Sequence, residues 1–208
     1  MDKKTVGIVI FDDVEVLDFC GPFEVFSATR LDEAKRRGEP SPFEVKLIAQ
    51  NGGQVCTSGG MRVSADYGFD NAPRMDILCV PGGWGTRREL DNPIMLSWLR
   101  ARAEEVELVT SVCTGSMLLG FAGLLEGRRA TTHWRSLEWM AQSFPKTKVI
   151  YDQHVVDDGS LISSAGISAG IDMALTVVKR YCGDAVARAT ARHMEYPFPE
   201  TNERRITV

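Results

Sequence analysis

Short, nearly continuous apolar runs alternate with segments of helical periodicity over most of the chain. Such runs are typical of strands in a parallel sheet, because the crossover helices bury both faces of each strand. The sequence therefore predicts an α/β protein in which a mainly parallel sheet lies between layers of helices. We expect strands at residues 5–11, 43–49, 76–80, 107–112, 129–132, 149–151, 154–156 and 161–164.

The segments between these strands carry the predicted helices. The first begins at the pair Gly21-Pro22, because a proline at the first helical position forfeits no hydrogen bond, and it runs to about residue 30. A second glycine pair, Gly59-Gly60, predicts a small hairpin between residues 55–58 and 61–67. Further helices are expected at residues 87–105 with a break near Pro93, and at 116–125, 137–143, 168–181 and 185–194.

Composition and charge restrict the class of protein. The chain has 208 residues, 44% of them hydrophobic, which is enough for one core that needs no disulfide or metal. The net charge is −4 and the basic residues are scattered, a distribution that favours neither nucleic acid nor an anionic membrane as partner. No apolar run approaches a signal peptide's core or the roughly 20 residues of a membrane span. We expect a cytoplasmic protein with one domain at residues 1–196 and a loose tail at 197–208.

The five cysteines argue against a metal centre. Their number is odd, no Cys-x-x-Cys pair occurs, and the spacing suits neither zinc nor an iron–sulfur cluster. In a reducing compartment they are free thiols, most of them small core residues. We therefore expect no metal and no cofactor. The cysteines stand at positions 20, 56, 79, 113 and 182.

One of these cysteines, Cys113, stands where a predicted buried strand passes directly into a predicted helix. A residue at such a junction must adopt a cramped backbone, as the serine of a nucleophile elbow does. Gly115, two residues later, supplies the small size that the turn requires. A thiol at the start of a helix meets unpaired N–H groups and the positive end of the helix dipole, so we expect a lowered pKa.

Other polar or flexible groups follow strands that end at the same edge of the sheet, where ligands bind in open parallel sheets. We expect the Thr114 N–H and the backbone around Gly82 and Gly83 to receive a developing negative charge. His133 follows a predicted strand and either orients or ionises the thiol or caps its own strand. Asp18 lies in the first connection between strand and helix at this edge.

The two remaining histidines carry no such signal. His154 lies in a polar hairpin and His193 lies on a charged helix, and we expect both to be solvated.

Five segments of the chain resemble the ThiJ/PfpI superfamily, whose fold is class I glutamine amidotransferase-like. They follow one another in order over nearly the whole chain. The resemblance implies a flavodoxin-like three-layer sandwich, with helices on both faces of the sheet, that assembles as a homodimer. The segments are Leu17-Asp18-Phe19-Cys20-Gly21-Pro22, Val80-Pro81-Gly82-Gly83, Thr110-Ser111-Val112-Cys113-Thr114-Gly115-Ser116, Ala130-Thr131-Thr132-His133-Trp134 and Gly166-Ile167-Ser168-Ala169-Gly170-Ile171-Asp172.

Within the superfamily, the sequence is most similar to the isocyanide hydratases, which are lyases. This resemblance implies that Cys113 is the nucleophile, that Asp18 is the catalytic acid, and that Thr114 lends a backbone donor and a hydroxyl group. It implies a reaction without cofactors in which a small organic isocyanide becomes an N-formamide through a thioimidate on Cys113. The resemblance further places Gly82 and Gly83 in the oxyanion loop and Ile167 in the lining of the site.

Departures from the family patterns separate the alternatives. The peptidases of the superfamily have a histidine directly after the nucleophile, where this chain has Thr114, so peptidase activity is not expected. The glyoxalase branch has glutamate where Asp18 stands, which disfavours addition of Cys113 to an aldehyde. Cys20 is unusual for a hydratase, and it is either a neighbour able to form a disulfide with Cys113 or a neutral replacement of one small residue by another.

A binding function is the alternative from a different class. The same segments occur in the N-terminal halves of AraC-type transcription regulators, where the domain senses a ligand. We expect no DNA-binding helices in this chain, so this reading makes it a stand-alone module for a small molecule. Turnover of a candidate substrate, as opposed to saturable binding alone, distinguishes the two readings.

Overall fold

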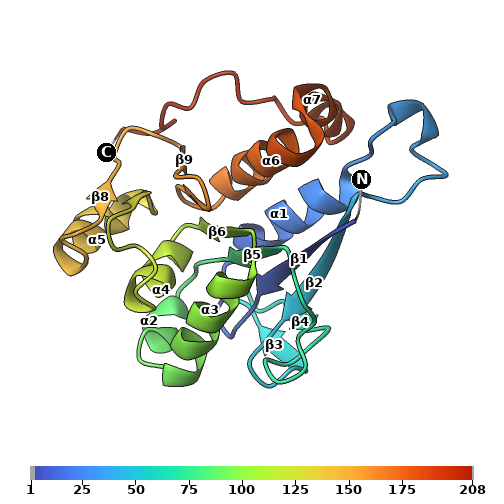
Figure 1. Cartoon of the computed structure of the whole chain (residues 1–208). Coiled ribbons are helices and arrows are strands. Elements are labelled where there is room, and N and C mark those ends of the chain that lie inside the picture. Colours follow the sequence, from blue (N-terminus) through green and yellow to red (C-terminus); the bar gives the residue numbers. More distant parts are fainter. Residues whose placement is uncertain (1–2, 208) are drawn as a thin grey trace.

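A computed structural model describes residues 3–207, and a six-stranded sheet forms its centre (Figure 1). The strand order is β2-β1-β5-β6-β10-β9, with the first five strands parallel and β9 antiparallel to β10. The predicted mainly parallel sheet is therefore confirmed. The strands are β1 (Lys4–Val9), β2 (Phe43–Ile48), β5 (Ile77–Val80), β6 (Leu108–Val112), β9 (Val155–Asp157) and β10 (Leu161–Ser164).

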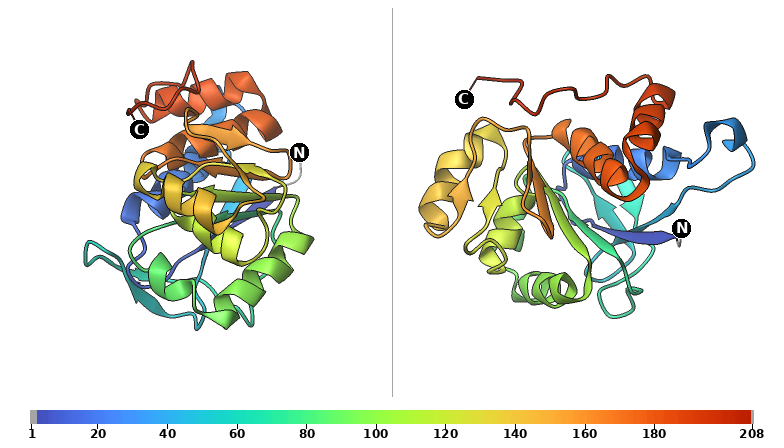
Figure 2. Two further views of the ribbon diagram at one scale, coloured as in Figure 1. Left: turned by 90° about the vertical axis from the view of Figure 1, so that its left-hand side faces the viewer. Right: turned by 45° about the horizontal axis from the view of Figure 1, so that its top comes forward.

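Helices cover both faces of this sheet, as the two further views also show (Figure 2). On one face α1 and α7 both pack against α6, and on the other α3 packs against α4. The result is the three-layer, flavodoxin-like sandwich that the sequence predicts. The helices are α1 (Val16–Ala28), α2 (Thr86–Glu89), α3 (Pro93–Glu105), α4 (Gly115–Phe121), α5 (Leu137–Ser143), α6 (Ala169–Cys182) and α7 (Asp184–His193), with 3-10 turns at Glu33–Lys35 and Trp134–Ser136.

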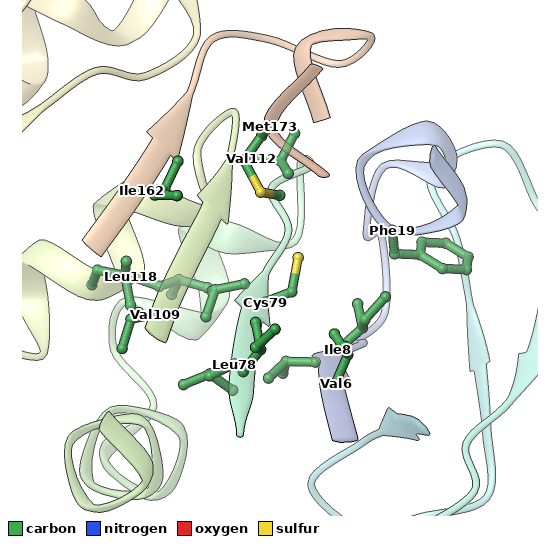
Figure 3. Packing of buried hydrophobic residues seen from close by; sticks show 14 of the residues in the cluster. Val6, Ile8, Phe19, Leu78, Cys79, Val109, Val112, Leu118, Ile162 and Met173 are labelled. Carbon is green, nitrogen blue, oxygen red and sulfur yellow. The ribbon is translucent and has the colours of Figure 1, made fainter. Parts of the chain in front are cut away.

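The core lies on both sides of the central strands. Every residue of β5, β6 and β10 is buried, which explains why none of these strands contains a charged residue and why β5 appears in the sequence as a continuous apolar run. Burial of apolar surface contributes roughly 25 cal/mol per Å², so this core is the main source of stability. Figure 3 shows buried side chains of this core, which come from β1, β5, β6, β10, α1, α4 and α6: Val6, Ile8, Phe19, Leu78, Cys79, Val109, Val112, Leu118, Ile162 and Met173.

The first helix begins at Val16, earlier than expected, and Pro22 lies inside it. The prediction that the helix starts at the Gly21-Pro22 pair is therefore wrong. Both residues are buried at the contact with α6, where a Cβ on Gly21 would lie 3.0 Å from the Ile171 side chain. A Cβ on Gly170 would in turn lie 3.4 Å from the Pro22 ring. The pair thus allows α1 and α6 to approach closely.

Smaller elements confirm or refine the predictions. The hairpin is present as β3 (Gln54–Cys56) and β4 (Arg62–Ser64). The strands expected at 129–132 and 149–151 are short, and β7 (Arg129–Ala130) and β8 (Lys148–Val149) pair with each other outside the main sheet. No helix within residues 3–207 has the length and apolar character needed to cross a bilayer.

His154 is buried beside the sheet, so the prediction that it is solvated is wrong. Its Nε2 lies 3.0 Å from Oδ2 of Asp172 on α6. The same carboxylate accepts a hydrogen bond from the Tyr196 hydroxyl and pairs with Arg205 at 2.8 Å. Local polarity suggested a solvated hairpin, but β9 lies against α6, and this contact buries His154 beside the Asp172 carboxylate. His193 is exposed, as expected.

The segment after Tyr196 is not the loose tail that its composition suggested. The Asn202 side chain donates to the Val155 carbonyl and accepts from the Val155 N–H, and so pairs with the free edge of β9. Arg204 donates to the carbonyls of Tyr151 and Thr132. The segment therefore runs back from α7 across the domain to the neighbourhood of β8, as Figure 1 shows.

Candidate active site

Cys113 lies at the carboxyl end of β6 in a conformation that side chains rarely adopt. Its φ is +54°, in the left-handed region, and α4 begins two residues later. Its N–H donates to the Ala165 carbonyl at 3.0 Å, and its own carbonyl accepts from the hydroxyls of Thr132 at 2.9 Å and Ser116 at 3.0 Å. These bonds hold the strained residue in place and confirm the predicted sharp turn.

The turn is possible only because Gly115 lacks a side chain. A Cβ at this position would overlap the Val80 carbonyl oxygen and lie 2.8 Å from the Pro81 carbonyl carbon. The ends of β5 and β6 therefore approach each other across Gly115. This contact brings the loop after β5 to the cysteine.

Asp18 reaches the same place from the first turn of α1 and is fully buried. Its Oδ2 accepts the Gly82 N–H at 2.8 Å, while Oδ1 has no hydrogen-bond partner in the part of the chain described. Burial raises the pKa of Asp18 from its ordinary 3.8 to about 8, and the bond from Gly82 opposes this shift. The carboxyl group is therefore protonated at neutral pH and has one free oxygen.

The pKa of the Cys113 thiol is raised, first by burial and second by the negative charge of Asp18. The N–H groups of Thr114 and Ile167 hydrogen-bond the sulfur and lower its pKa, but by less. The expectation of a lowered pKa is therefore wrong for the free protein. Removal of the thiolate from water, beside a carboxylate, outweighs the donors at the short helix. Both groups of this pair therefore keep their protons at neutral pH in the free protein.

The glycine loop after β5 positions two site residues. The sequence predicts that Gly82 and Gly83 receive a developing negative charge, but their N–H groups already donate to Asp18 and to Thr114 Oγ1, at 2.8 and 3.1 Å. The Thr114 hydroxyl also lies 3.2 Å from that of Thr86. The donors that remain directed at the sulfur are the N–H groups of Thr114 and Ile167.

Cys113 lies in a cavity of about 360 Å³, within the usual size of small-molecule sites. The sequence predicts Thr114, Gly83, His133 and Ile167 for this site, and all four line the cavity. Ile167, with φ of +53°, is a second strained residue there. The lining also contains residues that the sequence prediction did not place in the site. They are Glu15, Arg87, Arg135 and Ser136.

His133 forms part of the wall of the cavity. Its Nδ1 accepts the Arg135 N–H at 3.3 Å, which caps the following 3-10 turn, and it has no hydrogen bond to Cys113 among the described contacts. Burial, together with the positive charges of Arg135 and Arg204, lowers its pKa, so the ring is neutral at pH 7. His133 therefore caps the 3-10 turn that follows it, and neither its own strand nor the thiol is its hydrogen-bond partner among the described contacts.

Cys20 lies half-buried on α1 and does not line the cavity. Burial alone raises its pKa, so it has no charged neighbour that would activate it. Among the described residues, no group of three or more His, Cys, Asp and Glu side chains is placed to hold a metal ion.

The fold and the site define a class: flavodoxin-like α/β proteins with a cysteine at a strained turn after a central strand. The DJ-1/PfpI family matches residues 4–180, and the chain belongs to this family. It is 35% identical over 196 residues to an isonitrile hydratase of Pseudomonas putida, a match that covers 93% of this chain and 79% of the relative.

Two further relatives extend the comparison. The transcriptional regulator GbdR of Pseudomonas aeruginosa is 28% identical over 195 residues, which is 94% of this chain but 51% of the regulator. The crystal structure of a ThiJ/PfpI family protein from Pseudomonas syringae superposes with a TM-score of 0.83 at 27% identity, covering 97% of this chain and 79% of the other. The family thus includes both enzymes and regulators.

Substitution of Gly82 by alanine tests the packing of the glycine loop. A Cβ there would lie 2.5 Å from Thr114 Oγ1 and 3.0 Å from Asp18 Oδ2, so we expect Gly82→Ala to lower the free energy of unfolding by about 1–3 kcal/mol. Gly59→Ala is the control, because its Cβ would meet nothing within 4 Å. Urea denaturation measures both, and equal effects of the two variants would contradict the predicted packing.

The raised pKa of Asp18 predicts how stability depends on pH. The folded protein holds this proton up to about pH 8, whereas the unfolded chain releases it above 3.8. Unfolding then releases a proton, so raising the pH between these values lowers the free energy of unfolding by up to about 1.4 kcal/mol per pH unit. Asp18→Asn removes this loss, and its stability relative to the wild type should rise from pH 5 to pH 8. Denaturation at each pH measures the two free energies of unfolding. A constant difference between the wild type and Asp18→Asn across that range would rule out the raised pKa.

Proposed function

We propose that the protein hydrates small organic isocyanides to N-formamides by covalent catalysis at Cys113. The observation that carries this proposal is a strained thiol that lines a small cavity and has a fully buried, protonated carboxyl group, Asp18, beside it. The 35% identity to an isonitrile hydratase over most of both chains supports the choice of substrate class.

In the first step, the Cys113 thiol adds to the terminal carbon of the isocyanide. Sulfur forms a bond to this carbon while Asp18 donates its proton to the same carbon from Oδ1, the oxygen without a partner. The proton lost by the sulfur passes to Asp18, so the carboxyl group ends the step protonated. The product is a thioimidate, in which the carbon carries the hydrogen and is doubly bonded to nitrogen.

In the second step, water attacks the thioimidate carbon. Asp18 delivers a proton to the nitrogen and accepts one from the water, which gives a tetrahedral intermediate that carries a hydroxyl and an amine group. The carbon–sulfur bond then breaks, and the hydroxyl proton passes through Asp18 to the sulfur as the formamide leaves. The N–H groups of Thr114 and Ile167 stabilise the negative charge that develops on the departing sulfur.

The raised pKa values fit this sequence of proton transfers. An acid that protonates carbon must keep its proton at working pH, and burial does this for Asp18. A thiol that stays neutral in the free protein is protected from adventitious oxidation, because the thiolate is the reactive form. We also propose, on the family resemblance, that the protein acts as a cytoplasmic homodimer.

A ligand-sensing function is the second candidate. The similarity to GbdR favours it: the match covers 94% of this chain and about half of that regulator. This chain therefore corresponds to one part of a transcriptional regulator. In a sensor, the cavity would bind a small molecule without turnover. Carbonyl chemistry of the glyoxalase type is a third candidate, in which Cys113 adds to an aldehyde, and conversion of methylglyoxal to lactate would identify it.

Turnover of cyclohexyl isocyanide tests the proposal. We expect formamide production by the wild type, none above background by Cys113→Ala, and a rate lowered about 10²–10⁴-fold in Asp18→Asn because the proton donor is lost. Cys56→Ser, which removes an exposed thiol, is the matched control and should keep the wild-type rate. Gas chromatography of the formamide measures each rate. Full activity in Cys113→Ala would exclude covalent catalysis, and saturable binding without product would favour the sensor.

A further inference from the structure

Two exposed tryptophans stand at the cavity, and an arginine stacks on each. Trp84 is 66% exposed, and the Arg87 guanidinium carbon lies 4.5 Å from the centre of its ring. Trp134 is 40% exposed, and the Arg135 guanidinium carbon lies 4.8 Å from its ring centre. All four side chains line the cavity that contains Cys113. The lining therefore contains two similar pairs, each an indole covered by a guanidinium.

These two guanidinium groups have no acidic partner within residues 3–207. Neither Arg87 nor Arg135 forms a salt bridge or a side-chain hydrogen bond there. The neighbouring Arg88, in contrast, lies 3.4 Å from both Asp13 and Glu89. Stacking on an indole restricts the guanidinium but leaves its N–H donors free. The donors of both arginines are thus available to a ligand.

The charge at the cavity is positive, although the whole protein carries −4. Glu15 is the one acid in the lining, against the two arginines Arg87 and Arg135 as its cations. Its Oε2 accepts a hydrogen bond from Ser58 at 3.2 Å. Two cations and one anion leave one positive charge, which a ligand with a single negative charge would balance.

Resting on the hydratase function proposed above, we propose that the cavity selects isocyanides that carry a carboxylate. Arg87 and Arg135 bind the carboxylate, while Trp84 and Trp134 contact the carbon chain between it and the isocyanide. Arginine suits this role because its planar fork matches the two oxygens of a carboxylate. The isocyanide carbon then points to Cys113, and the carboxylate sets the orientation of the substrate.

A matched pair of substrates tests this selectivity. Isocyanoacetate and its ethyl ester share the reacting group and differ in the charge. We expect kcat/KM for isocyanoacetate to exceed that for the ester by at least about 10-fold at low salt, with most of the difference in KM, and we expect the preference to fall as salt increases. Equal values for the two substrates, or a preference for the ester, would overturn the proposal and leave the hydratase function intact.

Variants of the two arginines assign the preference to their side chains. Arg87→Gln and Arg135→Gln should each reduce the ratio of the two kcat/KM values about 5- to 10-fold, and the double variant should abolish the preference. Arg88→Gln, which removes a paired arginine outside the cavity lining, should keep the wild-type ratio. A ratio unchanged in the double variant would show that these arginines do not bind the carboxylate.

A binding measurement separates failure of this inference from failure of the proposed function. If neither isocyanide is hydrated, the hydratase function is wrong, and calorimetry with N-formylglycine and its ethyl ester on Cys113→Ala decides the question of the carboxylate. Binding of the acid at least about 10-fold tighter than the ester, lost in the Arg87→Gln/Arg135→Gln background, supports the subsite. Equal binding, or none, overturns it.

Discussion

The hydrogen bond from the Gly82 N–H to Asp18 Oδ2 joins the parts of the molecule on which the site depends. The donor comes from the loop after β5 and the acceptor from the first turn of α1, and neither element is close to the other in sequence. The bond is possible because Gly82 has no side chain to displace Thr114, whose N–H would lie 2.6 Å from a Cβ there. Three loops at one edge of the sheet therefore meet within a few ångströms around a single buried carboxyl group.

Burial of that carboxyl group accounts for the chemistry of the site. In water, a carboxyl beside a thiol would ionise and release its proton, but here desolvation raises the pKa of both groups. The backbone N–H groups of Thr114 and Ile167 favour negative charge at the sulfur, and in the proposed reaction they stabilise it as the sulfur departs. The sharp turn at Cys113 has two effects. It strains the backbone of Cys113, and it places the sulfur in reach of the N–H groups of Thr114 and Ile167.

The sheet and the cysteine turn were predictable from the sequence for physical reasons. β5, β6 and β10 are buried on both faces, so each is short and free of charged residues, and a buried strand that leads into a helix leaves few conformations for Cys113. The start of α1 was predicted wrongly because Gly21 and Pro22 serve the close contact between α1 and α6, and do not mark the beginning of the helix.

Other features depend on residues that are distant along the chain. His154 is buried because Asp172 faces it from another element, and no local pattern shows this pairing. The pKa of Cys113 was predicted in the wrong direction, because helix position is visible in a sequence and desolvation is not. Arg87 and Arg135 were missed for the same reason: only the fold brings them to one cavity.

Alkylation of Cys113 by iodoacetamide across a range of pH, followed by peptide mass analysis, tests the coupling of Cys113 and Asp18 most directly. The thiolate is the form that reacts, so the pH profile of the rate reports the pKa of the thiol. Because the charge of Asp18 raises that pKa, the profile of Asp18→Asn should lie at lower pH than that of the wild type. Coincident profiles for the two proteins would contradict the account.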